Sequence, residues 1–465
     1  MTDHDHYQAL AQQNLLLHFA KPQLDDLLVL ERAEGPYVFD TRGVRYIDAL
    51  SSLFCAQLGY SYGAEMAEVA TKQLTTLPFN TNWATAHPRS LELAEKVAAL
   101  APADDYKVFF TNGGSESVEA AWKFVREHFM AIGQPQRRKA IARQVAYHGV
   151  TLGALALTGI PGFKNDFGIP PIEVSHVSTT NPFRAPDGHD PEAFCARLLA
   201  EVEQAILAAG PDEVALIIAE PVQNAGGSIT PPPGYWAGLR ELADRYGTLL
   251  MADEVITGFG RLGEWFGVSR EGVAPDLISV AKGITSAYAP MGAVLANSKV
   301  IGPLADGAGR VFRHGVTFAG HPVSAAIALK SIEIFERDQV LENVRSLEGH
   351  LGKRMEELRA LPIVGDIRGA GFFWAVEMVK DANNTRFDQA ERDKLVRGFL
   401  PKRFRQAQLI ARTDDRGDAV MQIAPPLISD AALLDEIVDR LADVLTDAGK
   451  VMGVTDRVAA EPALA

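Results

Sequence analysis

Cysteine is scarce in this chain, which has only Cys55 and Cys195 among its 465 residues. With no Cys-x-x-Cys pair and no Cys/His cluster, the sequence excludes a disulfide scaffold and a zinc ribbon, and we expect no metal site. The first residues, Met1 to His6, are polar and acidic and lack the pattern of a secretory signal peptide. These absences fit a reducing compartment and predict a cytoplasmic protein.

Long apolar runs and excess positive charge are also missing. No run approaches the roughly 20 residues that a membrane helix needs. The formal net charge of −14 argues against a surface for nucleic acid or anionic lipid. We therefore expect a soluble globular protein with no nucleic-acid or membrane partner. Its length predicts two or more domains.

Short β-rich runs alternate with helical segments in the middle of the chain. Uninterrupted apolar strands, each followed by a helix, are typical of a mostly parallel α/β sheet covered on both faces. The predicted strands are residues 108–111, 139–147, 214–219, 248–252, 277–281 and 292–296.

The two ends of the chain flank this core. A helical run over 325–335 and an alternating strand over 371–378 indicate a smaller α+β domain. We predict an N-terminal segment of that domain at 1–60, a large cofactor-binding domain at 61–324, and the rest of the small domain at 325–465.

Polar side chains follow the predicted strands at the point where each ends. They are Thr111, Tyr147, Glu220, Asp253 and Lys282. Ligands of parallel sheets bind at the carboxyl ends of the strands, so these residues are expected to converge on one site.

Asp253 and Lys282 carry the most chemistry, because each closes an apolar run. If the runs are neighbouring strands, a carboxylate and an amine project from the same sheet edge. Pyridoxal phosphate needs such a pair: a lysine that captures its aldehyde, and an acid that keeps its ring nitrogen protonated. Alone the pair is weak evidence, since a strand-end Asp and Lys more often cap helices or pair on a rim.

The turn from Thr111 to Ser115 contains two glycines and leads into a predicted helix. Free N–H groups at a helix start bind phosphate, although a plain turn with Ser115 as the N-cap is common. The turn is not a P-loop, because no Gly-Lys-Ser/Thr follows. A GxGxxG dinucleotide fingerprint is also missing, which argues against a nicotinamide dehydrogenase.

Three further residues have both a functional and an ordinary interpretation. Tyr147 could stack on a planar ring or be a core aromatic. Thr317 lies in a loop rich in Gly, His and hydroxyl groups, which could simply lead into a helix after Pro322. Arg412 follows an apolar run; it would hold a carboxylate if it turned inward, but such arginines are usually on the surface.

Together the motifs resemble those of the class III aminotransferases, which are pyridoxal-phosphate enzymes of fold type I. The resemblance runs from about Asp40 to about Pro426 and is strongest from Asp253 to Lys282. The branch that it resembles most is the ω-amino acid (amine):pyruvate transaminases. The motifs, in order, are Thr-Asn-Gly-Gly-Ser-Glu, Tyr-His-Gly, Glu-Pro-Val-Gln, Asp-Glu-Val-Ile-Thr-Gly-Phe-Gly-Arg, Ala-Lys-Gly and Thr-Phe-Ala-Gly-His-Pro.

The resemblance implies a large domain with a mainly parallel seven-stranded sheet, a small α+β domain from both termini, and pyridoxal 5′-phosphate as cofactor. Lys282 would bind the cofactor covalently and Asp253 would pair with its ring nitrogen. Thr317 would reach the cofactor of a neighbouring subunit, which implies a homodimer with shared sites, or a tetramer. The other implied cofactor-binding residues are Gly114 and Ser115 at the phosphate, Tyr147 and Val255 on the ring faces, and His148 and Glu220.

Two departures bear on the substrate. Some relatives that use 2-oxoglutarate have a glutamate that pairs with the arginine at position 412, but Ala225 stands in its place. We therefore expect Arg412 to lack an acidic partner, to bind a substrate carboxylate and to swing aside for an amine. Phe54 stands where the pyruvate branch often has tryptophan. With Phe19 and Trp83 it is a candidate wall of the substrate pocket, beside Tyr147, although each could be core.

The leading hypothesis is transfer of an amino group from an ω-amino acid or primary amine to a keto acid such as pyruvate, in two ping-pong half-reactions. A 2-oxoglutarate-dependent aminotransferase, an aminomutase and a decarboxylating transaminase stay open. An alternative of another class is a non-catalytic protein that keeps the fold, which the presence of both Lys282 and Asp253 disfavours.

Overall fold

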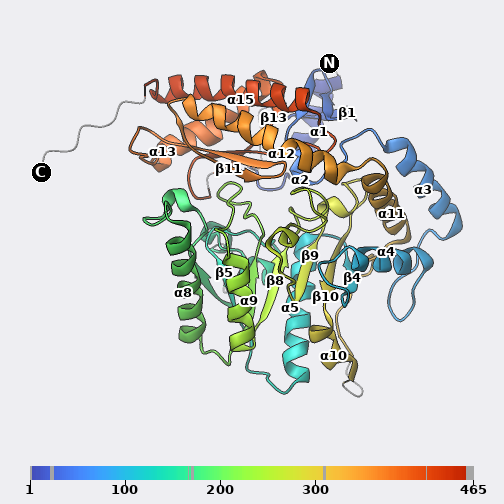
Figure 1. Ribbon diagram of the computed structural model, residues 1–465. Helices are drawn as coiled ribbons and strands as arrows, with labels where there is room; N and C mark the ends of the chain where they lie inside the picture. Colours follow the sequence, from blue (N-terminus) through green and yellow to red (C-terminus); the bar gives the residue numbers. More distant parts are fainter. Residues whose placement is uncertain are drawn as a thin grey trace, which may run out of the picture.

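The computed structural model describes residues 3–20, 26–165, 167–168, 172–306, 311–414 and 416–456. The middle of the chain forms the lower body in Figure 1, and segments from both ends of the chain form the upper body. No helix within the described ranges is long and apolar enough to cross a membrane.

Seven strands form the central sheet of the lower body, in the order β4-β10-β9-β8-β7-β5-β6. Neighbouring strands are parallel except at β10, which runs antiparallel to β4 and β9. This confirms the predicted mainly parallel seven-stranded sheet. The strands are β4 Lys107–Thr111, β5 Lys139–Arg143, β6 Glu173–Val177, β7 Val214–Ala219, β8 Leu249–Asp253, β9 Leu277–Val280 and β10 Gly292–Ala296.

Both faces of this sheet are buried, as β8 illustrates. Leu249 and Met251 pack in the apolar cluster that includes helix α5 (Gly114–Ala131). Leu250 and Ala252 join the cluster on the other face, with residues of α8 (Pro191–Ala209) and α9 (Tyr235–Tyr246). Each fully buried leucine contributes about 1.5–3 kcal/mol. A slip of one residue would exchange the two faces, so burial on both sides fixes where each strand ends.

Several strand ends differ from the prediction by one residue, one strand is much shorter than predicted, and one strand was not predicted. The strand predicted over 139–147 ends at Arg143, because Val145 has a left-handed φ of 64° and its N–H bonds to Gly159 O instead of the sheet. Strand β6 was not predicted: its Glu, Ser and His residues give no apolar run, which suits a partly exposed edge strand.

The upper body contains two four-stranded sheets. One joins β1 (Leu30–Glu34), β2 (Tyr37–Asp40) and β3 (Arg45–Asp48) to β13 (Leu409–Ile410). Because β13 pairs with β3, segments from both ends of the chain share this sheet. The other sheet consists of β11 Val364–Ala370, β12 Phe373–Met378, β15 Val420–Ile423 and β14 Arg412–Asp414.

This arrangement confirms the predicted small α+β domain from both termini. Arg412 does not continue the strand formed by the apolar run before it. That run forms β13, whereas Arg412 begins β14, which belongs to the other sheet. The domain boundaries at residues 60 and 325 stay a prediction.

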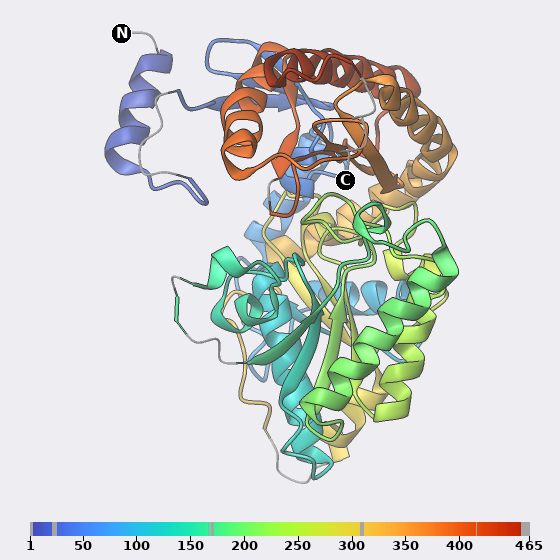
Figure 2. The same cartoon turned by 90° about the vertical axis from the view of Figure 1, so that its left-hand side faces the viewer.

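Helices pack around both bodies. Helix α15 (Ala431–Met452) lies along the top of the upper body in Figure 1, and in Figure 2 α1 (Asp3–Asn14) stands at its edge. The other main helices are α3 Gly63–Thr76, α4 Pro88–Ala99, α6 Leu152–Leu157, α10 Ser298–Asp306, α11 Pro322–Arg337, α12 Val340–Glu357 and α14 Leu400–Gln406.

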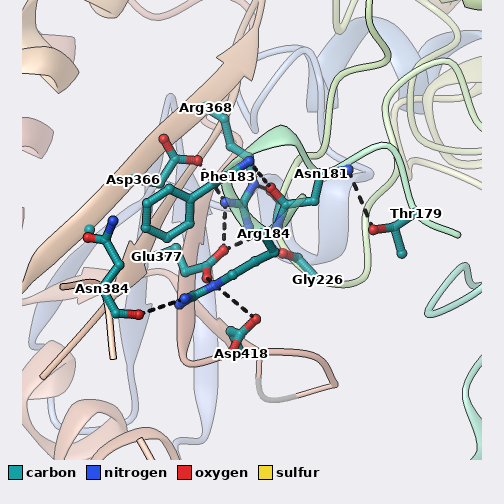
Figure 3. Close-up of polar contacts among 12 residues, drawn as sticks. Thr179, Asn181, Phe183, Arg184, Gly226, Asp366, Arg368, Glu377, Asn384 and Asp418 are labelled. Atoms are coloured by element: carbon teal, nitrogen blue, oxygen red, sulfur yellow. Dashed lines mark hydrogen bonds and ion pairs between the residues drawn. The ribbon is translucent and has the colours of Figure 1, made fainter. Parts of the chain in front are cut away.

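A buried network of ion pairs ties the two bodies together (Figure 3). Glu377 of β12 accepts hydrogen bonds from Arg184 Nε at 2.6 Å and from Arg368 Nη1 at 2.7 Å. Arg368 of β11 also donates to the carbonyl oxygens of Gly226 and Gly227, both at 2.6 Å. A Cβ at Gly227 would lie 2.5 Å from Val420, so this turn fits against the small domain only as glycine. We call Arg184, Arg368 and Glu377 the interface network.

Candidate active site

A single cleft lies at the carboxyl edge of the central sheet, with about 550 Å³ of empty space. Strands β8 and β9 are parallel neighbours, so the prediction that Asp253 and Lys282 project from one sheet edge is confirmed. Of the nine predicted cofactor-binding residues, all but Thr317 line the cleft: Gly114, Ser115, Tyr147, His148, Glu220, Asp253, Val255 and Lys282.

Asp253 is held rigidly at the floor of the cleft. One carboxylate oxygen lies 2.8 Å from His148 Nδ1, and the other accepts bonds from Ser279 Oγ at 3.1 Å and Val255 N at 3.2 Å. The carboxylate is almost fully buried. Three hydrogen bonds on a buried carboxylate fix its orientation, so it can serve a cationic partner in the cleft.

Lys282 lies two residues beyond β9, where the backbone takes a left-handed φ of 45°. Such a conformation is strained for a residue with a side chain, and it turns the chain sharply at the strand end. Removal from water lowers the pKa of the Lys282 ammonium and outweighs the attraction of Cys55 and Asp253. The amine therefore loses its proton more readily than a surface lysine, which favours nucleophilic attack and proton transfer.

Two buried polar atoms beside this pair have no hydrogen-bond partner among the described residues. They are His148 Nε2 and Glu220 Oε1. The other oxygen of Glu220 accepts a bond from Asn224 N at 2.9 Å, and burial raises the pKa of this carboxyl. Leaving such groups unpaired costs about 1–3 kcal/mol each, so a polar ligand in the cleft would stabilise them.

The start of helix α5 forms the other end of the cleft. Ser115 is not the N-cap that the simpler interpretation expected. The helix already begins at Gly114, after Gly113, and Ser115 Oγ accepts a bond from Val150 N at 3.1 Å. A Cβ at Gly114 would lie 2.9 Å from Val255, so packing against Val255 also requires glycine there. The N–H groups of this first turn can bind an anion such as phosphate.

Aromatic rings stand over the mouth of the cleft. Tyr147 meets Phe163 edge to face, with ring centroids 6.4 Å apart, and Phe163 in turn lies 5.2 Å from Phe19. Phe19 is exposed and does not itself line the cleft. Neither Phe163 nor Arg416, whose guanidinium lies over both Tyr147 and Phe163, was predicted from the sequence.

Arg412 lies on β14 of the small domain with its guanidinium 5.5 Å from the centroid of Phe54. The expectation that it lacks an acidic partner is wrong, because Asp414 Oδ2 is 3.4 Å from Arg412 Nη2. Arg412 and Asp414 are two residues apart on one strand, so their side chains point to the same face of the sheet. Ala225 is fully buried, and Phe54 packs in the core against Phe373.

Trp83 and Thr317 lie elsewhere. Both are exposed, and Trp83 lines a second hollow together with residues 311–316. Within the described residues, no group of His, Cys, Asp and Glu is arranged to hold a metal ion.

Comparison with known proteins identifies the family. The model of the class III aminotransferases matches residues 19–445. This chain is a class III aminotransferase.

Relatives of the aminotransferase support a narrower placement. It is 46% identical to a probable aminotransferase of Mycobacterium tuberculosis, over 94% of each chain. It is 39% identical to putrescine–pyruvate aminotransferase of Pseudomonas aeruginosa, over 93% of this chain and 94% of that one.

Solved structures agree. An (S)-enantioselective ω-transaminase from Thermomicrobium roseum superposes with a TM-score of 0.91 at 36% identity, covering 96% of this chain and 98% of that one. The ω-transaminase of Pseudomonas jessenii in complex with PMP gives 0.90 at 36% identity, covering 96% and 99%. The predictions of fold type I and of the ω-transaminase branch are confirmed.

Class III aminotransferases depend on pyridoxal phosphate, and the residues present fit that group. A helix start can take its phosphate, Asp253 can take its ring nitrogen, and the unpaired His148 and Glu220 atoms offer polar contacts. The enzyme thus transfers an amino group between an amine and a keto acid.

Proposed function

We propose that the enzyme moves an amino group from an ω-amino acid or primary amine to pyruvate. The observation that carries the proposal is the placement of the Lys282 amine and the Asp253 carboxylate in one cleft. When bound, pyridoxal phosphate supplies an electron sink for the substrate carbon.

The residues of the cleft have distinct proposed roles. Asp253, oriented by Ser279 and His148, holds a proton on the nitrogen that it faces. Lys282, whose pKa is lowered by burial, moves a proton between neighbouring carbon atoms. Tyr147 and Val255 flank a planar group and keep it oriented, while the first turn of α5 binds its phosphate.

The acceptor is proposed from the surroundings of Arg412. Its contact with Asp414 is an ion pair of 3.4 Å without a hydrogen bond between the two groups. Such a loose pair can release the arginine to a small carboxylate. With Ala225 in the hairpin at residues 223–229, no second acid locks it, which fits pyruvate and the pyruvate-dependent relative.

The site is proposed to be completed by a second copy of the chain. Trp83 and Thr317 are exposed and lie away from the cleft of their own chain. In a homodimer each would face the partner's cofactor. A cytoplasmic location is proposed from the two cysteines, Cys55 and Cys195, which are both free.

A spectroscopic screen tests the proposed function. The purified protein with pyridoxal phosphate should show a visible absorbance band that bleaches when a primary amine or β-alanine is added. Adding pyruvate should then restore the band faster than adding 2-oxoglutarate or oxaloacetate. If only 2-oxoglutarate restores the band, the acceptor is a dicarboxylate and not pyruvate. If none of the amines bleaches the band, the proposed function is refuted.

A further inference from the structure

Arg416 stands in the turn after β14, beside Tyr147 of the cleft but not among the residues that line it. Its guanidinium carbon lies 5.2 Å from the ring centroid of Phe163 and 5.7 Å from that of Tyr147, which lines the cleft. The side chain is about four-fifths buried, with 20% of its surface exposed. Two aromatic rings therefore hold a positive charge next to the entrance.

Within the part of the chain that the structure describes, this guanidinium donates no hydrogen bond. Among the described residues, which leave out residue 415, its one ionic contact is with Asp414 Oδ1 at 3.9 Å, beyond hydrogen-bond distance. That oxygen already accepts a bond from the backbone N–H of Arg416 at 2.9 Å. A cation–π contact restrains a guanidinium without using its N–H groups as hydrogen-bond donors. These N–H groups can therefore bind another ligand.

Arg412 repeats the pattern on β14, the strand before this turn. Its guanidinium lies over Phe54 and faces the other oxygen of Asp414 without a hydrogen bond. Burial, together with the charge of Arg416, lowers the pKa of Arg412 to about 10, so Arg412 stays charged at neutral pH. Asp414 faces both cations without a hydrogen bond to either guanidinium and offsets only part of their repulsion, so a second anion would relieve the rest.

We propose that Arg416 is a specificity-determining residue and that Arg412 and Arg416 together bind the substrate carboxylate at the mouth of the cleft. We call this pair the two-arginine site. The inference rests on the proposed function, because it concerns the acceptor of that reaction. Its consequence is that carboxylate affinity does not depend on Arg412 alone: Arg416, held beside two rings, stays in place when Arg412 moves aside for an apolar amine.

The test compares Arg416→Gln, which removes the charge, with Arg416→Lys, which keeps the charge but loses the planar donors. We expect Arg416→Gln to raise KM for pyruvate about tenfold, as for loss of one charged hydrogen bond, with little change in kcat. Arg416→Lys should recover part of the loss. Bleaching by a primary amine without a carboxylate should change less than threefold.

A matched control is Arg386→Gln. Arg386 is exposed, lies on another segment and pairs at 2.8 Å with Asp418, two residues beyond Arg416, so the variant removes a charge beside this turn but outside the cleft. Its KM for pyruvate should equal that of the wild type. Equal losses with carboxylated and carboxyl-free donors in Arg416→Gln would show that Arg416 only supports the fold and would overturn the proposal.

A binding experiment separates this inference from the proposed function. Calorimetric titration of the holoenzyme with propionate should show about tenfold weaker binding in Arg416→Gln than in the wild type and in Arg386→Gln. Unchanged propionate affinity would overturn the two-arginine site even if pyruvate is the acceptor. A wild-type enzyme that binds propionate through Arg416 but aminates no pyruvate would instead refute the proposed acceptor. If glutarate, which has two carboxylates, binds more tightly than propionate, the inference that both arginines bind one carboxylate is overturned.

Discussion

The active-site cleft and the interface network both bury charged groups, but they treat them differently. Glu377 in the network has both oxygens bonded, to Arg184 and to Arg368 with Asn181. In the cleft, His148 Nε2 and Glu220 Oε1 have no partner within the described residues. Arg184 Nη2 is the only network atom that is similarly unpaired.

This difference distinguishes structural charges from functional ones. A buried ion pair with satisfied partners holds two surfaces in register and needs no ligand. A buried polar group left open costs stability unless something binds it. The network therefore fixes the small domain and its Arg412 over the cleft, while the cleft keeps its donors and acceptors for cofactor and substrate.

The comparison predicts the largest effect at Lys282. Lys282→Ala should abolish steady-state transamination, because no other amine lines the cleft in the described structure. The midpoint of urea unfolding should not fall, since the substitution removes an amine whose charged form is disfavoured by burial. Turnover near that of the wild type would end the case for Lys282. Lys450→Ala, at an exposed lysine, is the control.

Asp253→Asn should reduce turnover by several orders of magnitude while the fold stays intact. The amide keeps the shape of the side chain but cannot hold a proton on a ring nitrogen. Single-turnover kinetics with circular dichroism as the check on folding measures this. An unchanged rate would assign Asp253 a purely structural role, and Asp244→Asn, at an exposed aspartate, should have no effect.

The opposite outcome is expected in the network. Glu377→Ala leaves Arg184 and Arg368 buried without their shared partner and should destabilise the protein by about 3–5 kcal/mol. Urea unfolding should detect it, whereas Glu333→Ala, which removes an exposed pair with Lys330, should cost about 0–1 kcal/mol. If both variants unfold at the same urea concentration, the network does not stabilise the domain interface.

Arg412→Ala should weaken the binding of carboxylated substrates by roughly 2–4 kcal/mol, because hydrogen bonds between charged groups are stronger than those between neutral groups. The rate of bleaching by the carboxylated donor β-alanine should fall far more than the rate of bleaching by an amine that lacks a carboxylate. Arg245→Ala, at an exposed arginine, serves as the control. Equal losses of bleaching rate with both donors would show that Arg412 supports the domain interface and does not bind substrate.

The smallest effect is expected at Thr317. Thr317→Ala should weaken cofactor affinity by about 0.5–1.5 kcal/mol, the value of one hydrogen bond across a dimer. Equilibrium dialysis measures the affinity, and Thr75→Ala on α3 is the matched hydroxyl control. Unaltered affinity would mean that Thr317 only shapes its own loop. A fully active monomer in sedimentation would contradict the shared site.

The sequence alone determined the central sheet and the residues at its ends. Strands buried on both faces must be continuous apolar runs, so β7 and β10 have the bounds that were predicted. The polar residue that follows such a run falls at the carboxyl edge, and this placed Asp253 and Lys282 together. These are local signals, readable without knowing which segments meet.

Only the tertiary structure decided what surrounds them. Asp414 faces Arg412 because both lie on β14, which is extended only through its pairing with β15. Arg416 reaches Tyr147 and Phe163 from a segment far away in the chain, and its residue type alone carries no signal of that meeting. Contacts between distant segments depend on how the sheets and their connections pack, which no local pattern of residues encodes.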